Sequence, residues 1–225
     1  ALWPFLKSNK LLMVLMLFAS GISAVGSGVV TGWVPEYLQR SLAVSPAEAG
    51  SMLGLIMLVS AFAGQGIYAA IVDWFAARGV LDAPIRIGLL PYALAIPLAW
   101  FAFAATSTAT FYPLLFAFAL SVAPGNAINN TVGQMIAPPA LRSRISAMFI
   151  FSISILGFAI GPAIVGWLSE YVVGEERLGQ AMQWTATGGA AITFVLLLLA
   201  LVWRSTWAVV QALRGHGLEE SSATP

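Results

Sequence analysis

The stretch ISAMFIFSISILGFAIGPAIVGWLS, from Ile145 to Ser169, contains no charged residue. It is longer than the about 20 apolar residues that a helix needs to cross the hydrocarbon core of a bilayer. A helix satisfies its own backbone hydrogen bonds in lipid, and the stretch is too long and too uniformly apolar for a strand of a membrane barrel. It therefore predicts a membrane-spanning helix.

Four further charge-free stretches occur, and the one from Ile87 to Leu141 is long enough for two helices. Its natural break is the hydroxyl-rich segment 106–110. Six helices are therefore expected in a bundle over residues 11–210, after a cytoplasmic lead-in at 1–10 and before a polar tail at 211–225. The chain does not begin with methionine, so we expect a preceding segment. The expected spans are 11–37, 47–72, 85–106, 109–137, 142–171 and 179–207.

The composition supports a membrane protein, because charged residues make up 8% of the chain and apolar residues 60%. Soluble domains carry about 25% charged residues, so a soluble enzyme and a disordered chain are excluded. A net charge of +1 offers no basic patch for nucleic acid. The chain lacks cysteine, its one histidine lies in the polar tail, and Asp73 and Asp82 are both interfacial. We therefore expect no catalytic site, no metal and no cofactor.

The basic residues predict the orientation, because loops on the cytoplasmic side carry an excess of Lys and Arg. With the first residues in the cytoplasm, eight basic residues fall inside and two outside. Both ends of the chain are then cytoplasmic, and we expect a bacterial inner membrane. The inner set is Lys7, Lys10, Arg78, Arg86, Arg142, Arg144, Arg204 and Arg214, and the outer set is Arg40 and Arg177.

An internal repeat is indicated by matches at a constant offset of 93 residues. Gly64 matches Gly157, and Trp74 matches Trp167. The repeating unit would be three helices, so the two copies would face opposite ways across the membrane. Inverted three-helix repeats are a building principle of secondary transporters. Chance matching among apolar helices is the alternative.

Five short segments carry more specific patterns in a fixed order. They are Trp33 to Arg40 (WVPEYLQR), Ser45 to Gly50 (SPAEAG), Asp73 to Gly79, Gln134 with Pro138 and Arg142, and Gly157 with Gly161-Pro162 and Gly166.

Together these segments resemble the C-terminal six-helix half of a major facilitator superfamily transporter and, within that superfamily, the spinster-like group. The resemblance covers roughly residues 1 to 205. It implies a 12-helix protein whose cavity is lined by the first and fourth helices of each half. In one departure, Trp74 follows Asp73 where the family usually has Arg, so a charge-relay role of this loop rests on Arg78 instead.

The fourth predicted helix carries a polar stripe. Asn126, Asn129, Asn130 and Gln134 follow helical spacing along one face. Carboxamides facing lipid would leave donors and acceptors unpaired. We therefore expect Asn126, Asn130 and, less strongly, Asn129 to line a cavity for a polar group of a substrate. Hydrogen bonding between helices is the structural alternative.

Two other helices offer weaker cavity candidates. Ser27 and Thr31 lie one turn apart in the first helix, where hydroxyls often bond their own backbone. Gln65 is the only long polar side chain in the middle of the second helix. A cavity role and a helix–helix hydrogen bond are both open for Gln65.

Gating or structural roles are expected at the helix ends and at bends. Small residues at Gly50-x-x-x-Gly54 and Gly157-x-x-x-Gly161 predict close helix contacts. Pro162 should weaken the fifth helix, because proline lacks a backbone donor. The gating or structural candidates are Asp73, Arg78, Gln134, Arg142, Gly161 and Pro162.

The sequence thus favours an all-α membrane protein of six helices in two inverted repeats, acting as half of a secondary transporter for a small organic or amphipathic solute. Its expected partners are the solute, the lipid bilayer and a missing N-terminal six-helix half. One alternative is a six-helix protein that works as a homodimer. Another is a membrane scaffold or assembly subunit that transports nothing.

Overall fold

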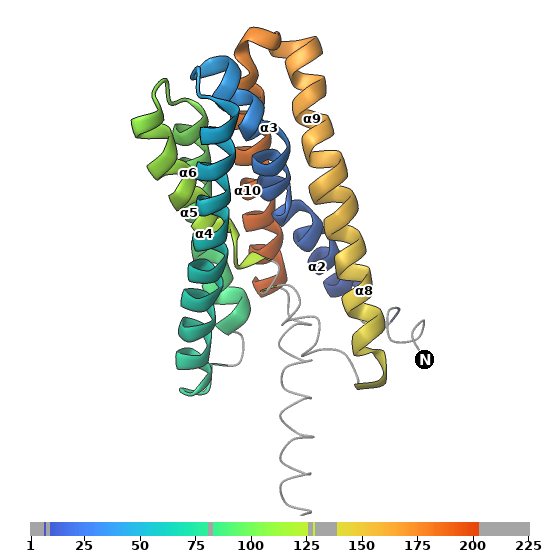
Figure 1. The fold of residues 1–225 in the computed structure, drawn as a ribbon. Helices are drawn as coiled ribbons and strands as arrows, with labels where there is room; N and C mark the ends of the chain where they lie inside the picture. The colour runs from blue at the N-terminus through green and yellow to red at the C-terminus, as the bar shows by residue number, and fades with distance from the viewer. Residues whose placement is uncertain (1–6, 8–9, 81–82, 126–127, 129–138, 203–225) are drawn as a thin grey trace, which may run out of the picture.

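The computed structural model describes residues 7, 10–80, 83–125, 128 and 139–202. Over these ranges every regular element is a helix, which confirms the expected all-α fold. The helices form one bundle, with α4, α5 and α6 on one flank, the fifth helix on the other and α2, α3 and α10 between them (Figure 1). Four of the expected cavity or gate residues, Asn126, Asn129, Asn130 and Gln134, lie outside the described residues.

The first and fifth helices are each built from more than one element. The first helix comprises α2 (Lys10–Ser23) and α3 (Val25–Ser41). The fifth helix runs without a break from Pro139 to Val173 as η1 (Pro139–Leu141), α8 (Arg142–Ser152), η2 (Ile153–Ile160), α9 (Gly161–Leu168) and η3 (Ser169–Val173). The others are α4 (Pro46–Ala76), α5 (Ala83–Phe103), α6 (Thr108–Val122), η4 (Glu175–Arg177) and α10 (Leu178–Val202).

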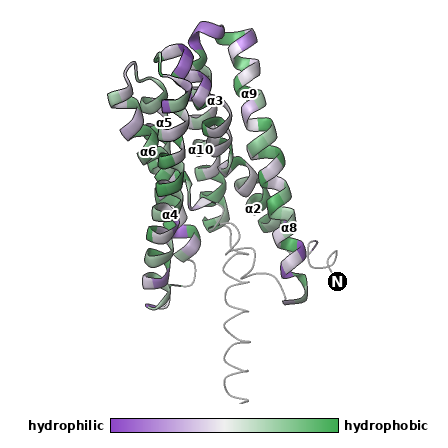
Figure 2. Ribbon diagram, viewed as in Figure 1, coloured by the Kyte–Doolittle hydropathy of each residue, from purple (hydrophilic) through white to green (hydrophobic). Residues whose placement is uncertain are grey.

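Five of the described helical spans are long and apolar enough to cross a membrane. The described part of the fourth helix, α6, is apolar but shorter. Hydrophilic residues gather toward the helix ends, and hydrophobic residues fill the length between them (Figure 2). This distribution supports an integral membrane protein.

The helix contacts repeat in the manner expected of two three-helix units. The second helix, α4, packs on α6, and the fifth helix packs on the first. Each of these contacts contains a glycine of the matched pair: Gly64 lies against Leu120 of α6, and Gly157 lies against Ala24 in the first helix. α4 and the fifth helix run in opposite directions (Figure 1). The last helices of the two units, α5 and α10, pack on each other. All three helices of one unit therefore have a counterpart in the other.

The first and fifth helices cross so closely that side chains would not fit at the crossing. A Cβ on Gly28 would collide with the carbonyl oxygen of Gly157, and a Cβ on Gly157 would collide with Ala24. A Cβ on Gly161 would lie 3.4 Å from Val25, an ordinary contact. At Gly50 and Gly54 the close contacts that we expected are absent from the described structure, because nothing lies within 4 Å of a Cβ built there.

Two irregularities lie at this crossing. The first helix is interrupted at Ala24, where a turn separates α2 from α3, whereas the sequence predicted one continuous span. The fifth helix adopts π-helical turns from Ile153 to Ile160, directly before Pro162. π-turns place successive side chains at a different angle around the helix than α-turns do. They therefore change the face that the fifth helix presents on either side of the crossing.

The crossing predicts opposite effects for two glycine-to-alanine substitutions. Gly157→Ala should lower the free energy of unfolding by about 1–3 kcal/mol, because the added methyl overpacks the contact with Ala24. Gly188→Ala in α10, where nothing lies within 4 Å of a Cβ, should be neutral or stabilising by up to about 1 kcal/mol through helix propensity. Thermal unfolding in detergent measures both, and equal effects would contradict the close crossing.

Candidate functional site

A small polar cavity lies between α3, α4 and α6, with one residue from the fifth helix. Its volume is about 180 Å³. The cavity brings together Ser27, Thr31 and Gln65, which the sequence had placed on two separate helices as cavity candidates. Its remaining lining residues are Val30, Met57, Ser60, Ala61, Ala119, Val122, Ala123 and Phe158.

The three hydroxyl groups of the cavity differ in what they can offer a ligand. Thr31 Oγ1 donates to the backbone oxygen of Ser27 at 2.9 Å, and Ser60 Oγ donates to that of Met57 at 3.3 Å. Their hydrogens are therefore used within their own helices, and their oxygens can only accept. Ser27 Oγ makes no hydrogen bond with the described residues, so this hydroxyl can both donate and accept.

Gln65 is the other group with unused hydrogen-bonding capacity. Its side chain is exposed in the bundle and bonds none of the described residues. A carboxamide provides two donors and one acceptor oxygen. Together with Ser27, Gln65 gives the cavity wall neutral donors and acceptors, and no lining residue is ionisable.

Sequence reasoning missed Ser60, Met57 and Phe158 as lining residues. A signal existed for one of them, because Met57, Ala61 and Gln65 follow one another at a spacing of four along α4. Phe158 had no such signal, since it lies within the π-helical turns of the fifth helix. The carboxamide stripe at Asn126, Asn129 and Asn130 stays a prediction.

The expected loop gate has an arrangement that the sequence did not reveal. The guanidinium of Arg78 stacks over the Trp74 ring, 3.4 Å from its centroid, and Arg78 donates to the Trp74 carbonyl at 2.9 Å. Asp73 is exposed at the end of α4 and forms no ion pair within the described residues. Trp74 therefore holds Arg78 by a cation–π contact.

The remaining gating or structural candidates lie on the fifth helix. Arg142 opens α8 and is exposed. Gly161 is buried against Val25, and the carbonyl of Pro162 accepts a hydrogen bond of 2.9 Å from Trp33 Nε1. Two of the family-like segments, one around Trp33 and one around Pro162, thus meet at the contact of the first and fifth helices.

Among the described residues, no group of three or more His, Asp or Glu side chains could hold a metal ion. The polar cavity brings Ser27 and Gln65, two groups with unused hydrogen-bonding capacity on adjacent helices, to one hollow. These groups could form hydrogen bonds with a neutral polar group.

Comparison with known proteins finds similarity in structure. No family model matches the chain, and the comparison with curated proteins gives no match. The proton:xylose symporter XylE of the major facilitator superfamily, bound to 6-bromo-6-deoxy-D-glucose, matches with a TM-score of 0.66 and 14% identity. The match covers 90% of this chain and 48% of that one.

Two further structures of the same transporter agree. The partially occluded inward-open xylose transporter XylE from E. coli matches with a TM-score of 0.66 and 13% identity, over 95% of this chain and 56% of that one. Its inward-open conformation matches with a TM-score of 0.58 and 15% identity, over 97% and 54%. The chain therefore has the fold of half a major facilitator superfamily transporter and spans about half of that transporter's length.

The cavity predicts water access at two positions. The 225 residues hold no cysteine, so single cysteines can be introduced by Ser27→Cys and Gln65→Cys. Both should react with a membrane-impermeant thiosulfonate reagent much faster than Leu198→Cys, an exposed position on the outside of α10. Such reagents attack the thiolate, which does not form in lipid. If Gln65→Cys were labelled as slowly as Leu198→Cys, the face of α4 that carries Gln65 would contact lipid and not water.

Proposed function

We propose that this chain is the C-terminal six-helix half of a secondary transporter, which moves a small organic or amphipathic solute by alternating access. The observation that carries the proposal is the polar cavity of Ser27, Thr31 and Gln65 in a bundle with the fold of half of XylE. In such transporters the two halves rock against each other around a central site.

The incomplete cavity and the open helix faces support a second six-helix body. A volume of about 180 Å³ is below the roughly 300–1,000 Å³ of a complete small-molecule site. Only 28% of an apolar 18-residue stretch of α4 is buried in the bundle, and the share is the same for such a stretch of the fifth helix. On α4, Gly50 and Gly54 have no neighbour within 4 Å, and small residues of this kind allow another helix to approach closely.

The lining chemistry favours a neutral polar or amphipathic solute over an ion. Ser27 and Gln65 supply hydrogen bonds, while Met57, Val122 and Phe158 supply apolar surface. No carboxylate lines the described cavity, so a proton-coupling group, if transport is proton-driven, would come from the other half. We include Asn126 and Asn130 in this site on their sequence spacing alone.

The finer assignments rest on the sequence alone. The segments from Trp33 to Arg40 and from Ser45 to Gly50 favour the spinster-like group and the C-terminal half. The distribution of basic residues favours cytoplasmic ends in a bacterial inner membrane.

A transport assay with matched variants tests the proposal. The full-length protein, reconstituted in proteoliposomes, should transport at least one solute from a panel of sugars, organic anions and amphipathic compounds. For that solute, Gln65→Ala should weaken binding about 2- to 10-fold, since one hydrogen bond is worth about 0.5–1.5 kcal/mol. Asn126→Ala and Asn130→Ala should act similarly while leaving expression nearly intact. Ser154→Ala, at an exposed hydroxyl outside the cavity that bonds the Ile150 carbonyl, should leave binding unchanged.

The alternatives predict other outcomes. A scaffold or assembly subunit would give neither solute flux nor ligand-induced thermal stabilisation across the panel. A homodimer would give disulfides between copies of a variant that carries both Gly54→Cys and Ile164→Cys, because α4 of one copy would then meet the exposed side of the fifth helix of the other. In a 12-helix protein, the same variant would stay monomeric.

A further inference from the structure

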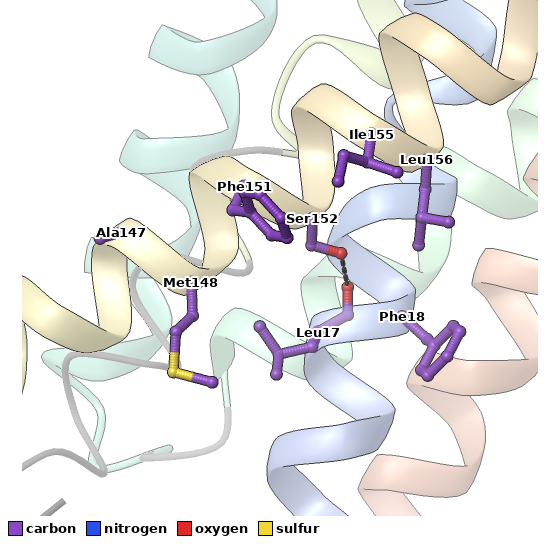
Figure 3. A pocket seen from close by; sticks show the side chains of 8 residues that line it. All are labelled: Leu17, Phe18, Ala147, Met148, Phe151, Ser152, Ile155 and Leu156. Atoms are coloured by element: carbon purple, nitrogen blue, oxygen red, sulfur yellow. Dashed lines mark hydrogen bonds between the residues drawn. The ribbon is translucent and has the colours of Figure 1, made fainter.

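A larger hollow lies between α2 and the fifth helix and shares no lining residue with the polar cavity (Figure 3). We call it the α2–α8 groove, and its volume is about 510 Å³. Met148 of α8 and Leu17 of α2 lie on its two sides. Its one polar side chain, Ser152, donates to the Leu17 carbonyl at 2.7 Å. The groove therefore presents hydrocarbon and has no free polar group for a solute.

The length of the groove matches one leaflet of a bilayer. Its lining on the fifth helix runs from Ala147 to Leu156, about 14 Å at the helical rise of about 1.5 Å per residue. The hydrocarbon core of a bilayer is about 30 Å thick, so each leaflet contributes about half of that. An acyl chain of one leaflet fits this length.

On both walls of the groove, a basic residue precedes the lining residues along the helix. On α2, Lys10, Val14 and Phe18 follow a spacing of four, and all three are exposed. On α8, Arg144 lies four residues before Met148 and is also exposed. Since residues four apart share a helix face, each wall carries a cation ahead of its apolar stripe.

These cations have no acidic partner in the described part of the chain. The ion pairs found there join Arg40 to Glu36 and to Glu175, and these residues lie at the opposite end of the first helix from Lys10. Lys10 and Arg144 are thus available to an anion at the membrane surface. Anionic lipid headgroups attract basic side chains at this depth.

We propose that the α2–α8 groove binds an anionic phospholipid, with one acyl chain in the groove and the phosphate between Lys10 and Arg144. The lipid would occupy the hollow between α2 and the fifth helix, which shares no lining residue with the polar cavity, and it is not transported. The proposal requires membrane insertion but does not depend on solute transport, so a failed transport assay leaves it standing.

Native mass spectrometry of the full-length protein in detergent tests the proposal, with dioleoylphosphatidylglycerol and dioleoylphosphatidylcholine as probes. Phosphatidylglycerol should bind more tightly than phosphatidylcholine. Lys10→Gln and Arg144→Gln should each weaken phosphatidylglycerol binding about 5-fold, and the double variant about 25-fold. Phosphatidylcholine binding should change little. Arg78→Gln, which removes a basic side chain beyond α4 on the other flank of the bundle, is the matched charge control.

Filling the groove gives an independent test of the acyl-chain site. Ala147→Trp should abolish phosphatidylglycerol binding, whereas Ala69→Trp on exposed α4 should not. Ala147 is exposed, so the variant should fold, and size-exclusion chromatography with thermal unfolding checks this. Equal binding of the two lipids, or unchanged phosphatidylglycerol binding in Ala147→Trp or in the charge double variant, would overturn the proposal. If another part of the protein buries the groove, phosphatidylglycerol binding should be unchanged in Ala147→Trp.

Discussion

The rest of the structure depends on the close crossing of the first and fifth helices. Gly28 meets the backbone of Gly157 there, with no room for a side chain on either residue. Hydrogen bonds secure the crossing on both sides, from Ser152 to the Leu17 carbonyl and from Trp33 to the Pro162 carbonyl. In lipid, where apolar surface gains little from association, such tight contacts and hydrogen bonds hold helices together.

This crossing and its symmetric counterpart position the polar cavity. Gly64 of α4 lies against Leu120 of α6, as Gly157 lies against the first helix. The cavity is formed by α3, α4 and α6, with Phe158 contributed from beside Gly157. Both glycine contacts of the inverted repeat therefore lie beside walls of the same cavity. The α2–α8 groove belongs to the same crossing but is apolar, so the two hollows suit different ligands.

The sequence predicted the helices and part of the cavity for clear physical reasons. A charge is costly within a bilayer, so charge-free stretches revealed spans. Ser27, Thr31 and Gln65 are polar groups that need a partner or water, and the structure places all three at one cavity. The interruption at Ala24 and the π-helical turns lie where Ala24 meets Gly157, two residues far apart in the sequence, and no local pattern predicted these irregularities. Phe158 was missed for that reason, and Gly50 and Gly54 were assigned contacts that the described bundle does not contain.

An experimental structure of the full-length protein in a lipid nanodisc tests the central claim most directly. The account predicts a second six-helix body against α4 and the fifth helix, with Ser27, Thr31 and Gln65 facing a water-filled space between the two bodies. Lipid covering the faces of α3 and α4 that carry these three side chains would contradict it.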